Sequence, residues 1–181
     1  MNDKSEEIQS LLENMTSTLP YIYQKKMQED ILPHLIKSLF NGTVCEIVKG
    51  LLDIQHLTEK NLYNQRIKLI TAHKEQKQLM ELKQKKKSSE FLANNRSDSS
   101  NMRLAQSQEI EIMENRQKEE LRKLDMRIIM ELDQKVMDQQ VTLEKAGVPT
   151  FHVTNNPNEI QMQIYILGFI KKIGSIVFHQ Y

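Results

Sequence analysis

The sequence has few of the residues that turn, cross-link or stack a compact fold. Its 181 residues include 5 Gly, 4 Pro, one Cys and no Trp, and aromatic residues make up only 6%. So few turn formers argue against a β sandwich or barrel and favour long helices. A single cysteine, Cys45, excludes an intrachain disulfide and a Cys-rich zinc site. A net charge of +1 gives the whole molecule no field that would attract nucleic acid or an anionic membrane.

Long apolar segments are also absent. In the most apolar segment, near the C-terminus, the longest uncharged run, Ile160 to Ile170, has 11 residues, whereas a helix needs about 20 to cross a bilayer. The first ten residues, MNDKSEEIQS, are acidic and polar and do not form a signal peptide. We therefore expect an intracellular protein of the nucleus, the cytoplasm or both, and no integral membrane segment.

Two long helices are the main prediction. The first spans 43–87 and begins at Thr43, after the stop signal Asn41-Gly42; the second spans 102–147 and ends at Ala146-Gly147, before Pro149. Residues 1–42 are predicted to form short N-terminal helices, with a break near Pro33. Residues 148–181 are predicted to form an extended turn and a short apolar helix, which begins at Asn156-Pro157 and ends at Gly174.

The segment between the long helices, 88–101, is rich in Ser and Asn and is predicted to be a flexible linker. Because two helices of equal length are joined by a polar loop, the simplest arrangement is an antiparallel hairpin. That arrangement would place Lys74, Lys77 and Lys83 near the acidic side chains at 109, 111 and 114. The predicted fold is all-α: a long, coiled-coil-like antiparallel hairpin with short helices at both ends of the chain.

Apolar residues at alternating steps of three and four predict a seam between the long helices. Gln55, Gln65, Gln117 and Gln139 would lie in the same seam and set its register. From Leu124 to Val136 the steps are three consecutive fours, which predicts a local stutter. The predicted interaction seam consists of Val48, Leu51, Leu62 and Leu69 on the first helix and Leu121, Leu124, Ile128, Leu132 and Val136 on the second.

Three blocks of the sequence resemble one family. They are GTVCEIVKGLLDIQHLTEKNLYNQR (42–66), MELDQKVMDQQVTLEKAGV (130–148) and FHVTNNPNE (151–159). They resemble the gonadal family, which groups the fly gonadal protein with the vertebrate DiGeorge syndrome critical region protein. The resemblance covers roughly residues 41–170 and brings no catalytic motif, cofactor or enzymatic activity. It implies a nuclear or intracellular protein with coiled-coil character and a role in development.

Candidate chemistry is sparse. No Gly-rich phosphate loop, nucleophile elbow or spaced metal-ligand set occurs, so we expect no enzyme, no cofactor, no metal and no small-molecule substrate. Cys45 lies among apolar helical neighbours, which favours a buried thiol over a reactive one. The leading hypothesis is a helical scaffold or adaptor that binds a protein partner, or itself, through helical faces.

Two alternatives remain open. Lys83, Lys85, Lys86 and Lys87 form a candidate nuclear-import cluster, which would suit a nuclear regulatory factor. We do not expect this cluster to read nucleic acid, because no aromatic platform accompanies it. The apolar helix near the C-terminus could instead attach a trafficking adaptor to a membrane surface, although its polar face is poor in Lys.

Overall fold

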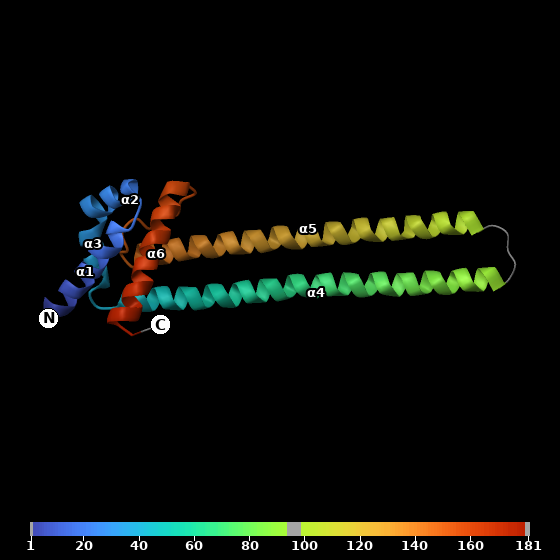
Figure 1. Ribbon diagram of the computed structural model, residues 1–181, viewed down its shortest axis with the longest axis horizontal. Helices are drawn as coiled ribbons and strands as arrows, with labels where there is room; N and C mark the ends of the chain where they lie inside the picture. The colour runs from blue at the N-terminus through green and yellow to red at the C-terminus, as the bar shows by residue number, and fades with distance from the viewer. Residues whose placement is uncertain (1, 94–98, 180–181) are drawn as a thin grey trace. The chain divides into compact units, whose positions relative to one another are not determined.

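The computed structural model describes residues 2–93 and 99–179, and every regular element among these residues is helical (Figure 1). The all-α class is therefore confirmed, as is the hairpin of two long helices. The elements in chain order are α1 (Asn2–Ser17), α2 (Tyr21–Lys26), the π-helical segment η1 (Met27–Ile31), α3 (Leu32–Leu39), α4 (Thr43–Ala93), α5 (Ser99–Lys145) and α6 (Pro157–Val177).

The chain divides into two compact units. Unit 1 consists of Met1–Leu57 and Asp133–Tyr181, and unit 2 is the continuous segment Thr58–Leu132. The long helices α4 and α5 contribute residues to both units, whereas the short helices belong to unit 1 alone. The N-terminal helices, the start of α4 and the C-terminal helix are thus parts of one core.

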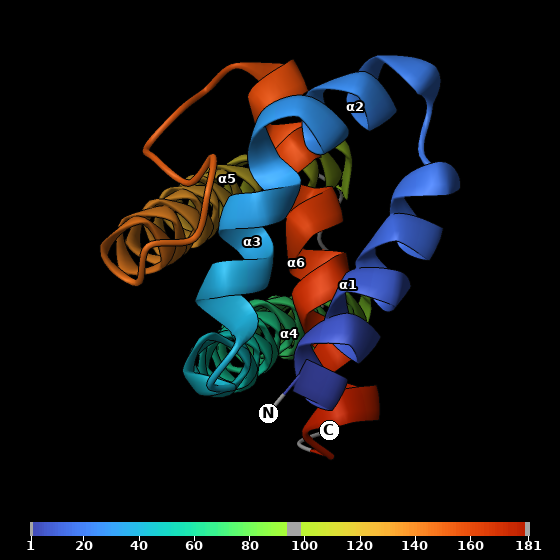
Figure 2. The ribbon, with the colours of Figure 1, turned by 90° about the vertical axis from the view of Figure 1, so that its left-hand side faces the viewer.

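The core of unit 1 is built around α6. Figure 2 shows α6 running between α1 and α3, and α1 packs against both of these helices. Leu12 of α1 and Leu35 of α3 are fully buried, as are Ile166 and Ile170 of α6. Because apolar side chains occur on most faces of α6, it can contact several helices at once. This burial is the main stabilising feature of unit 1.

Polar side chains join α6 to its neighbours. The buried amide of Gln140 on α5 donates to Gln163 Oε1 on α6 at 2.9 Å. The Gln163 Nε2 in turn donates to the backbone carbonyls of Thr150 and His152, both at 3.1 Å. Thr150 has a positive φ of 69°, an uncommon conformation for a β-branched residue. The Gln163 side chain therefore helps to hold the tight turn that precedes α6.

Several helix ends lie where the sequence places them. Gly147 has a φ of 75° and follows α5, and the Val148 N–H donates to the Leu143 carbonyl at 3.0 Å, which is a Schellman stop. Asn156 caps α6 by accepting from the Asn158 N–H. The helix α4 begins at Thr43, whose backbone N–H donates to Asn41 Oδ1 at 3.1 Å.

The predicted linker at 88–101 is wrong at both ends. Residues 88–93 are the last turns of α4, and α5 already begins at Ser99; residues 94–98 lie outside the described part of the chain. The serine hydroxyls explain the first difference, because Ser88 Oγ donates to the Gln84 carbonyl and Ser89 Oγ to the Lys86 carbonyl. Such bonds satisfy the serine hydroxyls within the helix, so a serine-rich composition does not by itself end it.

Two further boundaries differ. The helix α6 continues past Gly174 to Val177, since Gly174 is buried and takes a helical conformation. The irregularity near Pro33 is the π-helical segment η1, which precedes the proline, and Pro33 itself lies in the first turn of α3. That position suits proline because the first turn of a helix needs no donor from it.

Candidate interaction surface

The predicted seam forms the contact between α4 and α5 in unit 2. Leu62 and Leu124 are buried, with 3% and 9% of their surface exposed. Leu69 on α4 and Leu121, Ile128 and Leu132 on α5 are half-buried. The hairpin is therefore a narrow, two-helix contact in which few side chains are fully removed from water.

The remaining predicted seam residues lie in unit 1. Val48 is buried in its core, and Leu51 packs against that core. Val136 is not a seam residue, because 47% of its surface is exposed. Half-buried Lys135 and Gln139 occupy the inward positions instead, so the step after Leu132 is three and no run of consecutive fours leads to Val136.

Polar side chains cross the hairpin at several points. Arg66 binds Asp125 through two bonds of 2.8 and 3.2 Å, and Lys77 binds Glu114 at 2.7 Å, as predicted for Lys77. His73 Nε2 lies 2.9 Å from Glu120 Oε2, and Gln84 Nε2 donates to Glu109 at 3.4 Å.

Glutamine amides also bond across to the backbone of α4. Gln117 Nε2 donates to the His73 carbonyl at 3.1 Å, and Gln106 Nε2 donates to the Gln84 carbonyl at 3.3 Å. Gln117 is one of the four glutamines that the sequence places in the seam. In unit 1 a second of them, Gln139, donates to a third, Gln55, at 2.9 Å.

These contacts repeat every eleven residues. The pair Arg66–Asp125 becomes Lys77–Glu114 when eleven is added on α4 and subtracted on α5. The same shift converts the contact His73–Glu120 into Gln84–Glu109, and the Gln117 amide contact into the Gln106 contact. An eleven-residue period is 3.67 residues per turn, so helices that keep it need no left-handed supercoil. The hairpin therefore consists of equivalent structural repeats about 16.5 Å long.

The ion pairs shift the pKa values of the carboxylates that form them. Hydrogen bonding to Arg66, together with its positive charge, holds the pKa of Asp125 below its ordinary value. Lys77 lowers the pKa of Glu114 in the same way. Both carboxylates therefore stay charged at neutral pH and keep the register of the two helices.

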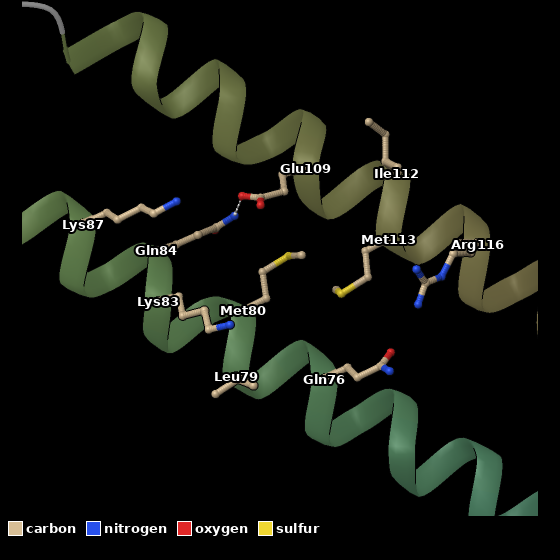
Figure 3. A pocket seen from close by; sticks show the side chains of 10 residues that line it. All are labelled: Gln76, Leu79, Met80, Lys83, Gln84, Lys87, Glu109, Ile112, Met113 and Arg116. Atoms are coloured by element: carbon tan, nitrogen blue, oxygen red, sulfur yellow. Dashed lines mark hydrogen bonds between the residues drawn. The ribbon is translucent and has the colours of Figure 1, made fainter.

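Two hollows lie on one side of the seam, and their linings are equivalent. The first has a volume of about 390 Å³ and the second about 770 Å³. In Figure 3, Met80 of α4 and Met113 of α5 point toward each other across the first hollow. The second hollow has Leu69 and Leu124 at the same places, eleven residues away.

The other lining positions correspond along the repeat as well, although the residues at three of them differ in chemical type. The α4 residues of the second hollow, Gln65, Lys68, Leu69 and Ala72, correspond to Gln76, Leu79, Met80 and Lys83 of the first. The α5 residues Glu120, Lys123, Leu124 and Arg127 correspond to Glu109, Ile112, Met113 and Arg116. Gln84 and Lys87 complete the lining of the first hollow, and we call the surface formed by both linings the two-hollow face.

The other side of the seam has two further depressions, of about 420 and 340 Å³. One depression there is lined by residues that include His73, Lys77 and Glu114, and the other by residues that include Gln84, Lys85 and Ser88. Acidic and basic side chains are nearly balanced in these linings. The two sides of the hairpin therefore differ in charge.

The lysine cluster is divided between these sides. Lys83 and Lys87 line the first hollow, Lys85 borders a depression on the other side of the seam, and Lys86 lines none of the hollows described here. All four side chains are exposed and lie on the helical turns of α4.

The apolar spacing did not reveal the hollows, because equivalent places in the seam carry residues of different types. Leu62, His73 and Gln84 occupy equivalent places in the repeat but share no chemical type. The charged pairs carry a clearer signal, since a cation and a carboxylate recur with opposite shifts of eleven residues. A search for that pattern would have found the repeat.

Other candidate chemistry is limited. The thiol of Cys45 is fully buried and lies 3.8 Å from the Ile170 carbonyl, and burial raises the pKa of this thiol to about 11. Among residues 2–93 and 99–179, no three His, Cys, Asp or Glu side chains gather to form a metal site. In the same residues one helix, α6, is both long enough and apolar enough to cross a bilayer, with a mean hydropathy of 1.2.

Comparison with known proteins identifies relatives over nearly the whole chain. Residues 2–179 match the family model described as DiGeorge syndrome critical region 6 (DGCR6) protein. The chicken protein DGCR6 is 44% identical over 164 residues, which cover 91% of this chain and 80% of the relative. The gonadal protein gdl of Drosophila melanogaster is 34% identical over 160 residues, which cover 88% and 74%. No solved structure gives a significant match.

Proposed function

This chain belongs to the DiGeorge syndrome critical region 6 family, and from that premise we propose that it is an intracellular, non-enzymatic scaffold or adaptor. Its hairpin would bind another protein through the two-hollow face. The observation that carries this proposal is the pair of equivalent hollows with apolar floors. Apolar surface of this kind, rimmed by polar residues, is typical of protein-binding sites.

Exposed apolar side chains beside the hollows support the same proposal. Leu79 and Ile112 line the first hollow and are 54% and 70% exposed. A partner that covered both would remove this surface from water, at about 25 cal/mol for each Å² buried. The linings pair no nucleophile with a general base, which favours binding over catalysis.

The experiment is site-specific photo-cross-linking in cells. A photoreactive amino acid replaces Leu79 or Ile112 and, in matched controls, the exposed residues Glu75 or Asn115, which line none of the four hollows. We expect discrete cross-linked proteins from positions 79 and 112 and none from 75 and 115. Equal products from all four positions, or none from any, would contradict the proposal.

Membrane attachment through α6 is a second candidate, because this helix has the length and hydropathy of a bilayer span. However, Met162, Ile166 and Ile173 of α6 are already buried in the core of unit 1. Attachment would therefore require α6 to leave that core. Flotation with liposomes decides the matter: if the full chain floats and a chain without residues 157–181 does not, a membrane role replaces the adaptor role.

Nuclear import through the Lys83–Lys87 cluster is the third candidate, and it is favoured by the exposure of all four lysines. Replacing the four lysines by Gln should move the protein out of the nucleus if they direct import. An unchanged distribution in fluorescence microscopy would remove this candidate.

A further inference from the structure

We propose that the two-hollow face binds an acidic, amphipathic α-helix of another protein, whose large apolar side chains are eleven residues apart. This inference rests on the proposed function, because it names the chemistry of the partner that the adaptor would bind. It follows from the charge of the face, from its repeat and from the character of the hollow floors.

The two-hollow face is strongly basic. Its linings contain six cationic side chains and only two carboxylates; the cations are Lys68, Lys83, Lys87, Arg116, Lys123 and Arg127. Both carboxylates already have partners, since Glu120 binds His73 and Arg116 while Glu109 accepts from Gln84. The face therefore presents a positive potential that a negatively charged partner would complement.

Four of these cations have no counter-charge within the described chain. Lys68, Lys83, Lys87 and Arg127 form no ion pair with any residue of 2–93 or 99–179. By contrast, Lys77, on the other side of the seam, is bound to Glu114 at 2.7 Å. Three of these four available cations thus lie along one edge of the hollows, on α4, and the fourth, Arg127, lies on α5.

The spacing of the hollows fits a third helix. Equivalent floor residues, such as Leu69 and Met80, are eleven residues apart, which is about 16.5 Å along a helix. A guest helix laid along the groove has the same rise per residue, so its own residues eleven apart reach both floors. These residues also stay within about 20° of one face, because eleven residues make just over three full turns. Anchors seven residues apart would be only about 10.5 Å from each other and could not fill both hollows.

Other occupants fit less well. A two-fold dimer through this face would bring its cations against the same cations of the second copy. Neither hollow contains an aromatic side chain on which a nucleic-acid base could stack. A phosphate backbone or a flat lipid surface would also leave the apolar floors without a partner, whereas an amphipathic helix fills them.

The test is an unbiased selection with the full-length protein. A display library of 22-residue helical peptides, randomised among Leu, Ser, Glu and Lys, is selected for binding, and enriched peptides are measured by fluorescence anisotropy. We expect the enriched peptides to carry net negative charge and Leu at eleven-residue intervals. Enrichment of basic peptides, of peptides with seven-residue spacing, or of no peptide would overturn the proposal.

Charge-reversed variants assign the binding site. Changing Lys68, Lys83 and Lys87 to Glu should lower the affinity for the enriched peptides about tenfold or more. The matched control changes three other exposed lysines to Glu, namely Lys60, Lys74 and Lys86, which line neither hollow of the face. Circular dichroism confirms that both variants fold. Equal weakening by both sets, or no weakening by the first, would place the peptide elsewhere and contradict the proposal.

Competition separates the remaining classes of partner. A 30-nucleotide single strand and phosphatidylserine vesicles are tested for displacement of the peptide at the same ionic strength. We expect neither to displace it, and tight binding of either probe with no peptide binding would overturn the inference. If photo-cross-linking at Leu79 captures proteins while selection shows no preference for acidic helices, the adaptor function stands and this inference fails. If cross-linking also fails, both fall.

Discussion

Removing one whole repeat from each arm of the hairpin should leave the rest of it paired. The double deletion takes out residues 66–76 from α4 and 115–125 from α5, which are eleven residues each. Lys77 then follows Gln65 and Glu114 precedes Met126. The pair Lys77–Glu114 thus comes to the place that Arg66–Asp125 held.

The control removes nine residues from each arm, 66–74 and 117–125. Nine residues are two and a half turns, so the far part of each helix rotates by about 180° relative to the near part. Its seam side chains would then face solvent, among them Met80, Ile110 and Met113. These side chains are half-buried, so we take about half of the 1.5–3 kcal/mol for full burial, or about 1 kcal/mol each. With Phe91 included, the free energy that pairs the two helices in the far part of the hairpin should be smaller in the control by on the order of 4 kcal/mol.

Hydrogen exchange measures this difference directly. In the eleven-residue deletion, amides of residues 78–93 and 99–112 should keep their protection, and the mean residue ellipticity should not change. In the nine-residue control, a loss of about 4 kcal/mol corresponds to opening that is roughly a thousandfold more frequent. Equal protection in the two variants would show that the eleven-residue repeat does not pair the helices.

Three further outcomes follow from burial and charge. Ile166→Ala should lower the free energy of unfolding by about 2–5 kcal/mol in a denaturant titration, because the side chain is fully buried. Ile164→Ala, on the exposed side of α6, should change it little. Asp125 and Glu114 have pKa values below their ordinary 3.8 and 4.5. The stability that they contribute is therefore present above those values and is lost as the pH falls through the lowered pKa values. Thermal melts from pH 6 to pH 2 measure this loss, which Asp125→Asn should reduce. With a pKa of about 11 and no exposed surface, Cys45 should react with a maleimide only in the unfolded chain; equally fast labelling of the native chain would contradict its burial.

The helices and their pairing could be predicted from sequence because their signals are local. The start of α4 after Gly42 and the stop at Gly147 depend on single residues with positive φ. The pairing of Lys77 with Glu114 follows from equal helix lengths and the position of the turn. Local rules of this kind require no knowledge of the tertiary contacts.

Other features depend on tertiary context and were predicted wrongly or missed. Val136 fits an apolar spacing, yet Lys135 takes the inward place, since a lysine can bury its stem and keep its charge in water. Ser88 belongs to a segment with linker composition but extends α4, where Gln106 of α5 donates to its hydroxyl at 3.2 Å. The hollows could not be derived from one helix alone, because each requires side chains from both arms.

The division of the chain also governs how the protein is made. Ile8, Leu12 and Met27 leave the ribosome early, but their partners on α6 come only after the whole of Thr58–Leu132 has been translated. At about 5–20 residues per second, those 75 residues take roughly 4 to 15 seconds. During that interval the nascent N-terminal segment exposes apolar side chains that α6 later buries. Exposed apolar surface of this kind is what chaperones at the ribosomal tunnel exit bind.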